Sequence, residues 1–143
     1  MRERPDWDTY FLDIAEAVSR RSHDADTQVG CVIVAPNRHI VGTGYNGFAP
    51  GLPDDKLPNT RPDKYPYMVH AEQNAIANAE RSLQGCTCYC LFTPCNDCAK
   101  LLLAAGIRRV VCRMAYWNSD WAKIQELLEL GGVEVKVVRE IEK

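Results

Sequence analysis

The chain has 143 residues, a mass of 16.1 kDa, a net charge of −2 and ordinary fractions of hydrophobic (46%) and charged (25%) residues. These values predict one compact domain over residues 1–143 with a core of its own, and they exclude global disorder. No apolar run approaches the roughly 18 residues that a membrane-spanning helix needs. Lysine and arginine are scattered rather than gathered into a basic surface. We therefore expect neither a membrane nor a nucleic acid as a partner.

The N-terminal segment and the cysteines indicate the compartment. The first eight residues are charged and lack the apolar centre of a secretory signal. Seven cysteines are an odd number, and a disulfide framework is not expected in a reducing environment. We therefore expect a cytoplasmic protein whose thiols are core residues or metal ligands.

The first half of the chain predicts a helix, a hairpin and a long loop. Residues 7–20 carry apolar side chains at helical spacing, with Asp6 as a suitable N-cap. The β-branched run at 28–35 predicts a buried strand, and 40–44 returns as the second strand of a hairpin. Five prolines in the stretch 46–66 exclude a helix or a central strand there. A loop of this length in a compact domain is usually functional or mobile.

In the second half, helical and strand patterns alternate. The predicted helices are residues 70–81, 96–105 and a third from a cap at Ser119 to Gly131 and Gly132, and the predicted strands are 87–92, 109–113 and 133–138. A hairpin followed by strands that alternate with helices implies right-handed crossovers and a mostly parallel sheet. We predict an α/β fold, a three-layer α/β/α sandwich with a five-stranded mixed sheet.

Two short motifs bring together residue types that bind metals. His70 and Glu72 open a predicted helix, and Cys95 and Cys98 open another directly after a strand. Exposed N–H groups at a helix N-terminus stabilise thiolates. One imidazole and two thiolates suit Zn2+, and three protein ligands leave a fourth position for water, which is typical of a catalytic site.

Glu72 gives this predicted site a catalytic residue. Zinc lowers the pKa of a bound water from about 15.7 to about 7. Glu72 lies two residues after His70 and can reach that water without binding the metal, so its expected role is general acid/base. His-x-Glu followed by Pro-Cys-x-x-Cys is the signature of zinc nucleobase deaminases. The alternative, a structural zinc knuckle, needs a fourth protein ligand, and the sequence has no second Cys-x-x-Cys pair.

Beyond these motifs, the sequence resembles the deoxycytidylate (dCMP) deaminase family of the cytidine deaminase-like superfamily. The segments that carry the resemblance are residues 7–22, 27–34, 42–47, 70–76, 94–100, 105–111 and 116–120. The resemblance covers most of the chain and is weakest at 48–67. It implies a cytidine deaminase-like fold and the hydrolytic deamination of dCMP to dUMP with release of ammonia, which supplies dUMP for thymidylate synthesis.

The resemblance also implies roles for individual residues. One catalytic Zn2+ per chain would be held by His70, Cys95 and Cys98, with Glu72 as the general acid/base. The implied substrate contacts are the Ala71 N–H and the Thr93 carbonyl at the pyrimidine edge, Asn46 at the deoxyribose, Arg21, Ser22 and Asn74 at the phosphate or sugar, and Tyr116 at the border of the pocket. Other interpretations stay open for some of them: a turn residue at Asn46, a surface amide at Asn74, a helix-end charge at Arg21 and a packing aromatic at Tyr116.

Further implications concern partners and a second metal. The resemblance implies a homohexamer and the effectors dCTP and dTTP, with Mg2+ only where a nucleoside triphosphate effector binds. Many members of the family carry additional Cys or His ahead of the His-Ala-Glu motif, and some of these bind a second, structural zinc. Residues 47–69 contain neither, so no second zinc is expected there. Cys86, Cys88 and Cys90 alternate along one predicted strand and are interpreted as core residues.

Other functions compete with a nucleotide deaminase, and the nearest are other deaminases. Free-nucleoside cytidine deaminases often have cysteine at the position of His70, and guanine deaminases share His-x-Glu but fit the Tyr-Asn-Gly segment at 45–47 poorly. A deaminase acting on tRNA or single-stranded DNA needs basic groove residues, which the acidic composition does not favour. A non-enzymatic zinc-stabilised subunit is a further alternative. It does not account for Glu72, because the fold needs no carboxylate beside the metal.

Overall fold

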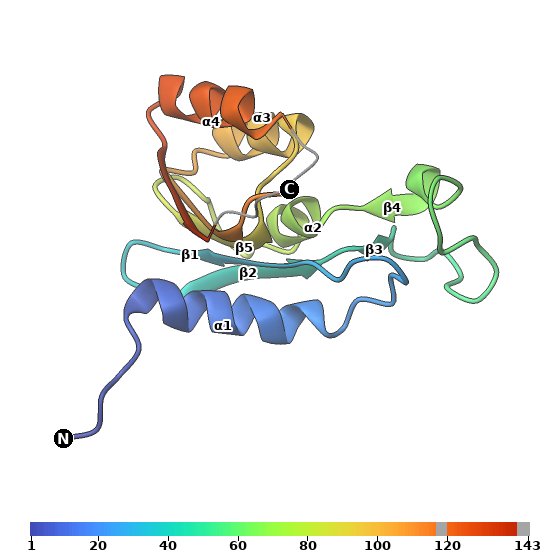
Figure 1. Cartoon of the computed structure of the whole chain (residues 1–143), viewed down its shortest axis with the longest axis horizontal. Coiled ribbons are helices and arrows are strands. Elements are labelled where there is room, and N and C mark those ends of the chain that lie inside the picture. Colours follow the sequence, from blue (N-terminus) through green and yellow to red (C-terminus); the bar gives the residue numbers. More distant parts are fainter. Residues whose placement is uncertain (117–119, 140–143) are drawn as a thin grey trace.

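The computed structural model describes residues 1–116 and 120–139, in which helices cover both faces of one central sheet (Figure 1). The helices in these ranges are α1 (Trp7–Ser19), α2 (Ala71–Ala77), α3 (Asn96–Ala104) and α4 (Trp121–Leu130). The strands of the central sheet are β1 (Gly30–Val34), β2 (Ile40–Tyr45), β5 (Thr87–Phe92), β6 (Arg109–Met114) and β7 (Glu134–Arg139). The short strands β3 (Gly47–Phe48) and β4 (Met68–Val69) form a separate two-stranded ladder. The 3-10 turn η1 (Tyr65–Tyr67) comes directly before β4 in the chain. None of the described helices is long and apolar enough to cross a membrane.

The strand order of the central sheet is β2-β1-β5-β6-β7, and the sheet is mixed, as predicted. β1 pairs antiparallel with both of its neighbours, whereas the β5–β6 and β6–β7 pairs are parallel. The expectation of a mostly parallel sheet therefore holds for only half of these pairings. The reason is that the connection through α2 crosses over β1 and joins β2 to β5. β1 therefore lies between two strands that run in the direction opposite to its own.

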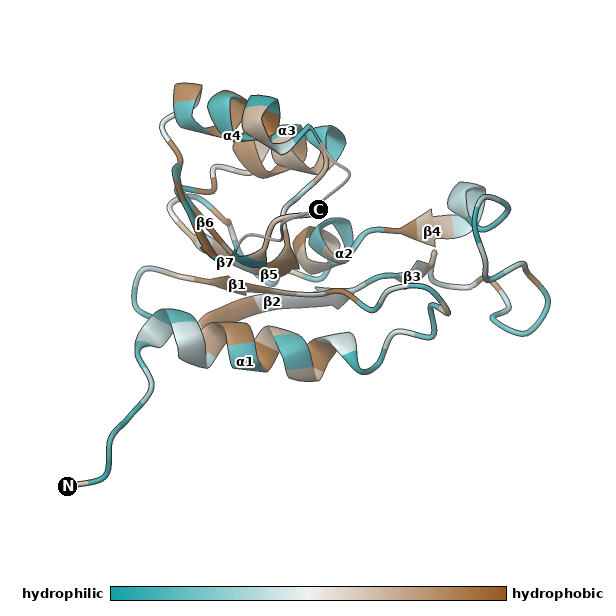
Figure 2. Ribbon diagram, in the orientation of Figure 1, coloured by the Kyte–Doolittle hydropathy of each residue, from teal (hydrophilic) through white to brown (hydrophobic). Residues whose placement is uncertain are grey.

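Side-chain alternation along β1 divides the core into two halves. Val32 and Val34 face α1 and pack with its buried Phe11 and with residues of β5 and β6. Cys31 and Ile33 point to the other face, where α2, α3 and α4 cover the sheet. Every residue of β1 is buried, which explains its continuous apolar run. Hydrophobic residues concentrate in the central strands, whereas the loop between β3 and η1 is largely hydrophilic (Figure 2).

Glycine brings α2 close to the sheet. A Cβ at Gly44 in β2 would overlap the backbone of Ala71 and Ala75, so only glycine allows this approach. Because α2 begins at Ala71, the packing at Gly44 fixes the start of this helix. The residues around that start are those singled out above as metal-binding and catalytic.

Three details differ from the sequence-based expectation. α2 ends at Ala77 rather than at residue 81, because the following segment bonds to β2: the Asn78 side chain donates to the Thr43 carbonyl and the Glu80 N–H to the Val41 carbonyl. The proline-rich loop begins with β3 and is closed by its pairing with β4. The predicted cap at Ser119 lies outside the described residues. α4 follows Asp120, whose side chain makes no capping hydrogen bond.

The cysteines of β5 are core residues, as expected. The core on the α2 side contains the buried thiols Cys31, Cys86, Cys88, Cys90 and Cys112. The sulfurs of Cys31 and Cys88 are 3.3 Å apart. These thiols fill the space between the sheet and the helices that carry the site.

Candidate active site

The three predicted metal ligands come together at the N-termini of two helices. His70 is the N-cap of α2, Cys95 is the N-cap of α3, and Cys98 lies in the first turn of α3. His70 Nδ1 is 3.1 Å from Cys98 Sγ and 3.5 Å from Cys95 Sγ, and the three ligand atoms lie within 4.8 Å of one another. Within residues 1–116 and 120–139, no other histidine, cysteine or acidic residues form such a group.

The donor set and its spacing fit zinc. Tetrahedral Zn2+ with a Zn–N distance of about 2.0 Å and Zn–S distances of about 2.3 Å holds a nitrogen and a sulfur about 3.5 Å apart and two sulfurs about 3.8 Å apart. The observed distance from His70 Nδ1 to Cys95 Sγ, 3.5 Å, agrees with this, and the distance to Cys98 Sγ, 3.1 Å, is slightly shorter, so little movement is needed. One nitrogen and two sulfurs from the protein also leave one tetrahedral position for a small ligand. Nδ1 is the imidazole atom that faces both sulfurs.

Hydrogen bonds favour a thiolate at Cys95. Hydrogen bonds from Cys98 and then His70 lower the pKa of Cys95 to about 4, and the Cys98 N–H also donates to Cys95 Sγ at 3.4 Å. The same thiol–thiol hydrogen bond is the main cause that raises the pKa of Cys98, and the hydrogen bond with Cys95 is the main cause that raises the pKa of His70. A thiolate is the form in which cysteine binds metals, so Cys95 is prepared for that role.

Glu72 is buried beside this group. It lies in the first turn of α2 and is 5% exposed. Burial raises its pKa above the ordinary value of 4.5. A carboxyl group with a raised pKa exchanges protons more readily near neutral pH, which is what a general acid/base requires.

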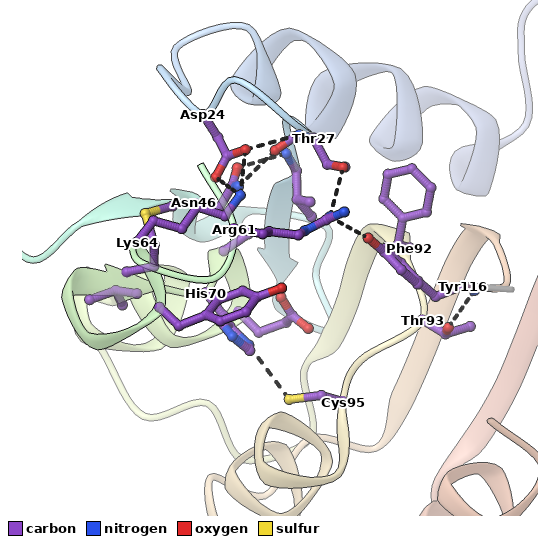
Figure 3. A pocket seen from close by; sticks show the side chains of 16 residues that line it. Asp24, Thr27, Asn46, Arg61, Lys64, His70, Phe92, Thr93, Cys95 and Tyr116 are labelled. Carbon is purple, nitrogen blue, oxygen red and sulfur yellow. Dashed lines mark hydrogen bonds and ion pairs between the residues drawn. The ribbon is translucent and has the colours of Figure 1, made fainter. Parts of the chain in front are cut away.

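The site opens into a cavity of about 310 Å³ (Figure 3). Its lining includes His70, Glu72 and Cys95, whereas Cys98 lies behind them in α3. Four of the predicted substrate contacts also line it: Asn46, Ala71, Thr93 and Tyr116. The remaining lining residues are Asp24, Thr27, Val29, Arg61, Lys64, Tyr65, Met68, Val69 and Phe92.

Two of the predicted substrate contacts also hold the cavity walls in place. The Asn46 amide accepts from the Val29 N–H and donates to the Thr27 carbonyl, both at 2.8 Å. The Thr93 hydroxyl accepts from the Tyr116 N–H at 2.9 Å. The Asn46 side chain is therefore more than a turn residue, because it fixes the segment that leads into β1.

Arg21, Ser22 and Asn74 do not line this cavity. Arg21 and Asn74 instead line a second cavity of about 350 Å³. The Arg21 guanidinium lies over the Tyr45 ring at 6.0 Å, and the Asn74 amide donates to the Tyr45 carbonyl. The Ser22 hydroxyl donates to the Asn46 carbonyl. The structure therefore does not place these three side chains in the wall of the cavity beside His70, and their contact with the substrate phosphate or sugar stays a prediction.

The long loop supplies cavity residues that the sequence analysis missed. Lys64 is buried, and its ammonium donates to Asp24 and Asp26 at 2.8–2.9 Å. Burial alone would lower the pKa of Lys64, but these carboxylates raise it overall. Arg61, from the same loop, reaches Tyr116 across the cavity. The length of the loop indicated a function, but nothing in its local pattern identified these two side chains.

Comparisons with known proteins agree with this site. The sequence model of the cytidine and deoxycytidylate deaminase zinc-binding region matches residues 5–114. The chain is 43% identical over 131 residues to deoxycytidylate deaminase from Homo sapiens, covering 86% of this chain and 74% of the relative. It is 40% identical over 122 residues to deoxycytidylate deaminase from Mycobacterium phage D29, covering 76% and 94%.

A solved structure with the same fold contains nucleotides. It is the dCMP deaminase from the cyanophage S-TIM5 in complex with dCMP and dUMP, with a TM-score of 0.75 and 28% identity, covering 98% of this chain and 100% of that one. Its agreement with the fold described above extends over nearly the whole chain. Together with the match over residues 5–114 and the His70, Cys95 and Cys98 group, it shows that this chain belongs to the zinc-binding cytidine and deoxycytidylate deaminase family.

Proposed function

We propose that this protein is a zinc-dependent hydrolase that deaminates dCMP to dUMP and releases ammonia, which supplies dUMP for thymidylate synthesis. The observation that carries the proposal is the buried carboxyl group of Glu72 beside a His/Cys/Cys group in one cavity. Relatives named deoxycytidylate deaminase and the fold shared with a dCMP deaminase support the choice of substrate.

His70 Nδ1 and the sulfurs of Cys95 and Cys98 would hold one zinc ion per chain. When bound, zinc supplies Lewis acidity and an activated water. Glu72 takes the proton that the attacking water releases and delivers it to N3 of the cytosine ring. It then transfers the remaining proton from the hydroxyl on C4 to the amino group, which leaves as ammonia as the C4 carbonyl forms. Its burial keeps bulk water from competing for these protons.

The other contacts orient the pyrimidine. The Ala71 N–H and the Thr93 carbonyl belong to nearly buried residues at the wall of the cavity, and we assign them to the polar edge of the base. Asn46, whose amide is anchored between Thr27 and Val29, is assigned to the deoxyribose. Tyr116 borders the cavity beside Thr93.

The charge of the chain favours a free nucleotide over a nucleic acid. A polyanion requires a basic groove, whereas this chain has a net charge of −2 and Lys64, in the cavity wall, is neutralised by two carboxylates. We further propose that residues 1–143 form a single domain, and that this domain assembles as a homohexamer in the cytoplasm. Its seven free thiols suit a reducing compartment. For a dCTP or dTTP effector, with Mg2+, we propose the second cavity around Arg21 and Asn74.

The proposal is tested by measuring ammonia release from dCMP, deoxycytidine, CMP and dCTP side by side. We expect dCMP to be the best substrate. Glu72→Gln should keep its zinc and melting temperature but lose at least about 1,000-fold in kcat, since it removes the proton carrier. Glu80→Gln, an exposed position just beyond α2, is the matched control and should retain activity. Turnover retained by Glu72→Gln would contradict the mechanism, and inertness toward all four compounds would contradict the substrate.

A further inference from the structure

The loop between β3 and β4 supplies one wall of the catalytic cavity. Arg61, Lys64 and Tyr65 come from this loop and stand opposite Asp24 and Thr27, which precede β1. Arg61 and Lys64 are the only arginine or lysine side chains among the described residues that line the cavity. An anionic group on a ligand bound there depends on one or both of them.

The ammonium group of Lys64 is fully hydrogen-bonded to other side chains of the protein. Its ammonium donates to Asp24 Oδ1 at 2.9 Å, Asp24 Oδ2 at 2.8 Å and Asp26 Oδ2 at 2.9 Å. An ammonium group has three N–H donors, and these contacts use all three. The side chain is 5% exposed. Lys64 therefore anchors the loop and has neither a donor nor net charge left for a ligand.

Arg61, in contrast, uses few of its hydrogen-bond donors within the protein. Its Nη2 donates to the Tyr116 hydroxyl at 3.0 Å and lies 3.4 Å from the Thr27 hydroxyl, and both of these groups are neutral. Asp26 Oδ2 forms a longer ion pair with Arg61 Nε at 3.9 Å, which is beyond hydrogen-bonding distance, and it already accepts from Lys64. Within the described part of the chain, Nε and Nη1 donate to no acceptor. Most of the five guanidinium donors are thus available in the cavity.

Arg61 also lies in the right place for a group remote from the reacting base. Its guanidinium reaches between Thr27 and Tyr116, on the side of the cavity away from Cys95 (Figure 3). A nucleotide with its base at Glu72 and His70 must extend its sugar and phosphate away from Cys95. Two hydroxyl groups beside a guanidinium provide further donors for phosphate oxygens.

We propose that Arg61 binds the 5′-phosphate of the substrate, assisted by the hydroxyls of Thr27 and Tyr116, and so sets the preference for a nucleoside monophosphate over the unphosphorylated nucleoside. Phosphate oxygens replace the two neutral acceptors of Arg61 when the substrate enters. This assignment rests on the proposed deamination of dCMP.

The test compares phosphorylated and unphosphorylated compounds in the holoenzyme. Since hydrogen bonds to charged groups are lost, Arg61→Ala should lower kcat/KM for dCMP about 30- to 100-fold, mostly through KM, and lower kcat/KM for deoxycytidine less than about 3-fold. Arg61→Lys should recover only part of the loss, because an ammonium cannot bind phosphate in a bidentate manner. Lys56→Ala, an exposed position in the same loop that does not line the cavity, is the matched control.

A binding measurement separates this inference from the proposed function. Calorimetric titration with dUMP and deoxyuridine should show that Arg61→Ala weakens dUMP about 30- to 100-fold and deoxyuridine little. An unchanged dUMP-to-deoxyuridine affinity ratio in this variant overturns the role of Arg61, whatever the turnover. Wild-type protein that binds dUMP through Arg61 but does not deaminate dCMP would refute the proposed function and support the phosphate site.

Discussion

Replacing Lys64 by methionine should strongly destabilise the protein, because it leaves Asp24 charged and buried. The side chains of Lys64 and Asp24 are 5% and 1% exposed and are joined at 2.8 Å. Removing one partner of a buried ion pair costs about 3–5 kcal/mol. With an unfolding entropy of about 2.1 cal/mol/K per residue, the 143 residues give about 0.3 kcal/mol/K, so the melting temperature should fall by about 10–17 °C.

Thermal unfolding of zinc-loaded protein, followed by circular dichroism, measures this effect. Lys64→Met/Asp24→Asn should be more stable than Lys64→Met alone, because the second change removes the uncompensated charge. Lys100→Ala is the control: Lys100 and Asp97 form an exposed pair at 3.4 Å, and its loss should cost less than about 1 kcal/mol. A melting temperature of Lys64→Met within about 2 °C of wild type, or a double variant less stable than the single one, would refute the reasoning.

Two further predictions concern the support of the site and acid stability. Gly44→Ala should shift α2, and lower both zinc content and activity, because its Cβ would overlap the backbone of that helix; Gly47→Ala, whose Cβ would meet atoms no nearer than 3.8 Å, should keep both. Asp8 holds Arg109 with two hydrogen bonds of 2.7–2.8 Å, and this contact holds the pKa of Asp8 well below its ordinary value of 3.8. A lowered pKa contributes stability above pH 3.8 that is lost as the pH falls toward the folded value. In urea unfolding, the stability difference between wild type and Asp8→Asn should therefore be largest at pH 6 and shrink toward pH 3, and a difference independent of pH would contradict this.

The metal-binding group could be predicted because its spacing is local. Cys95 and Cys98 are three residues apart at the start of α3, and His70 and Glu72 are two residues apart at the start of α2. The strand pattern likewise predicted a three-layer fold. The antiparallel pairing of β1 with β5 was less accessible, because the positions of the crossover helices decide it.

The part of the cavity wall formed by Asp24, Arg61, Lys64 and Tyr116 could not be predicted in the same way. Lys64 and Asp24 are 40 residues apart, and Arg61 and Tyr116 are 55 apart, so no local pattern links them. The resemblance implied substrate contacts for Arg21 and Asn74; in the structure both side chains contact Tyr45, and the substrate contacts stay a prediction. Arg21 follows α1 and Asn74 lies within α2, so the positions of both side chains depend on how these helices pack against the sheet.

The C-terminal unit of α4 and β7 contributes no side chain to the catalytic cavity, whose described lining ends at Tyr116. It covers one flank of the sheet through residues such as Trp121 and Leu128. The outer surface of α4, where Leu130 is 80% exposed, is therefore a convenient attachment point for a fluorophore or an immobilisation tag. A probe attached there allows the protein to be followed during turnover without obstructing the entry of nucleotides into the cavity.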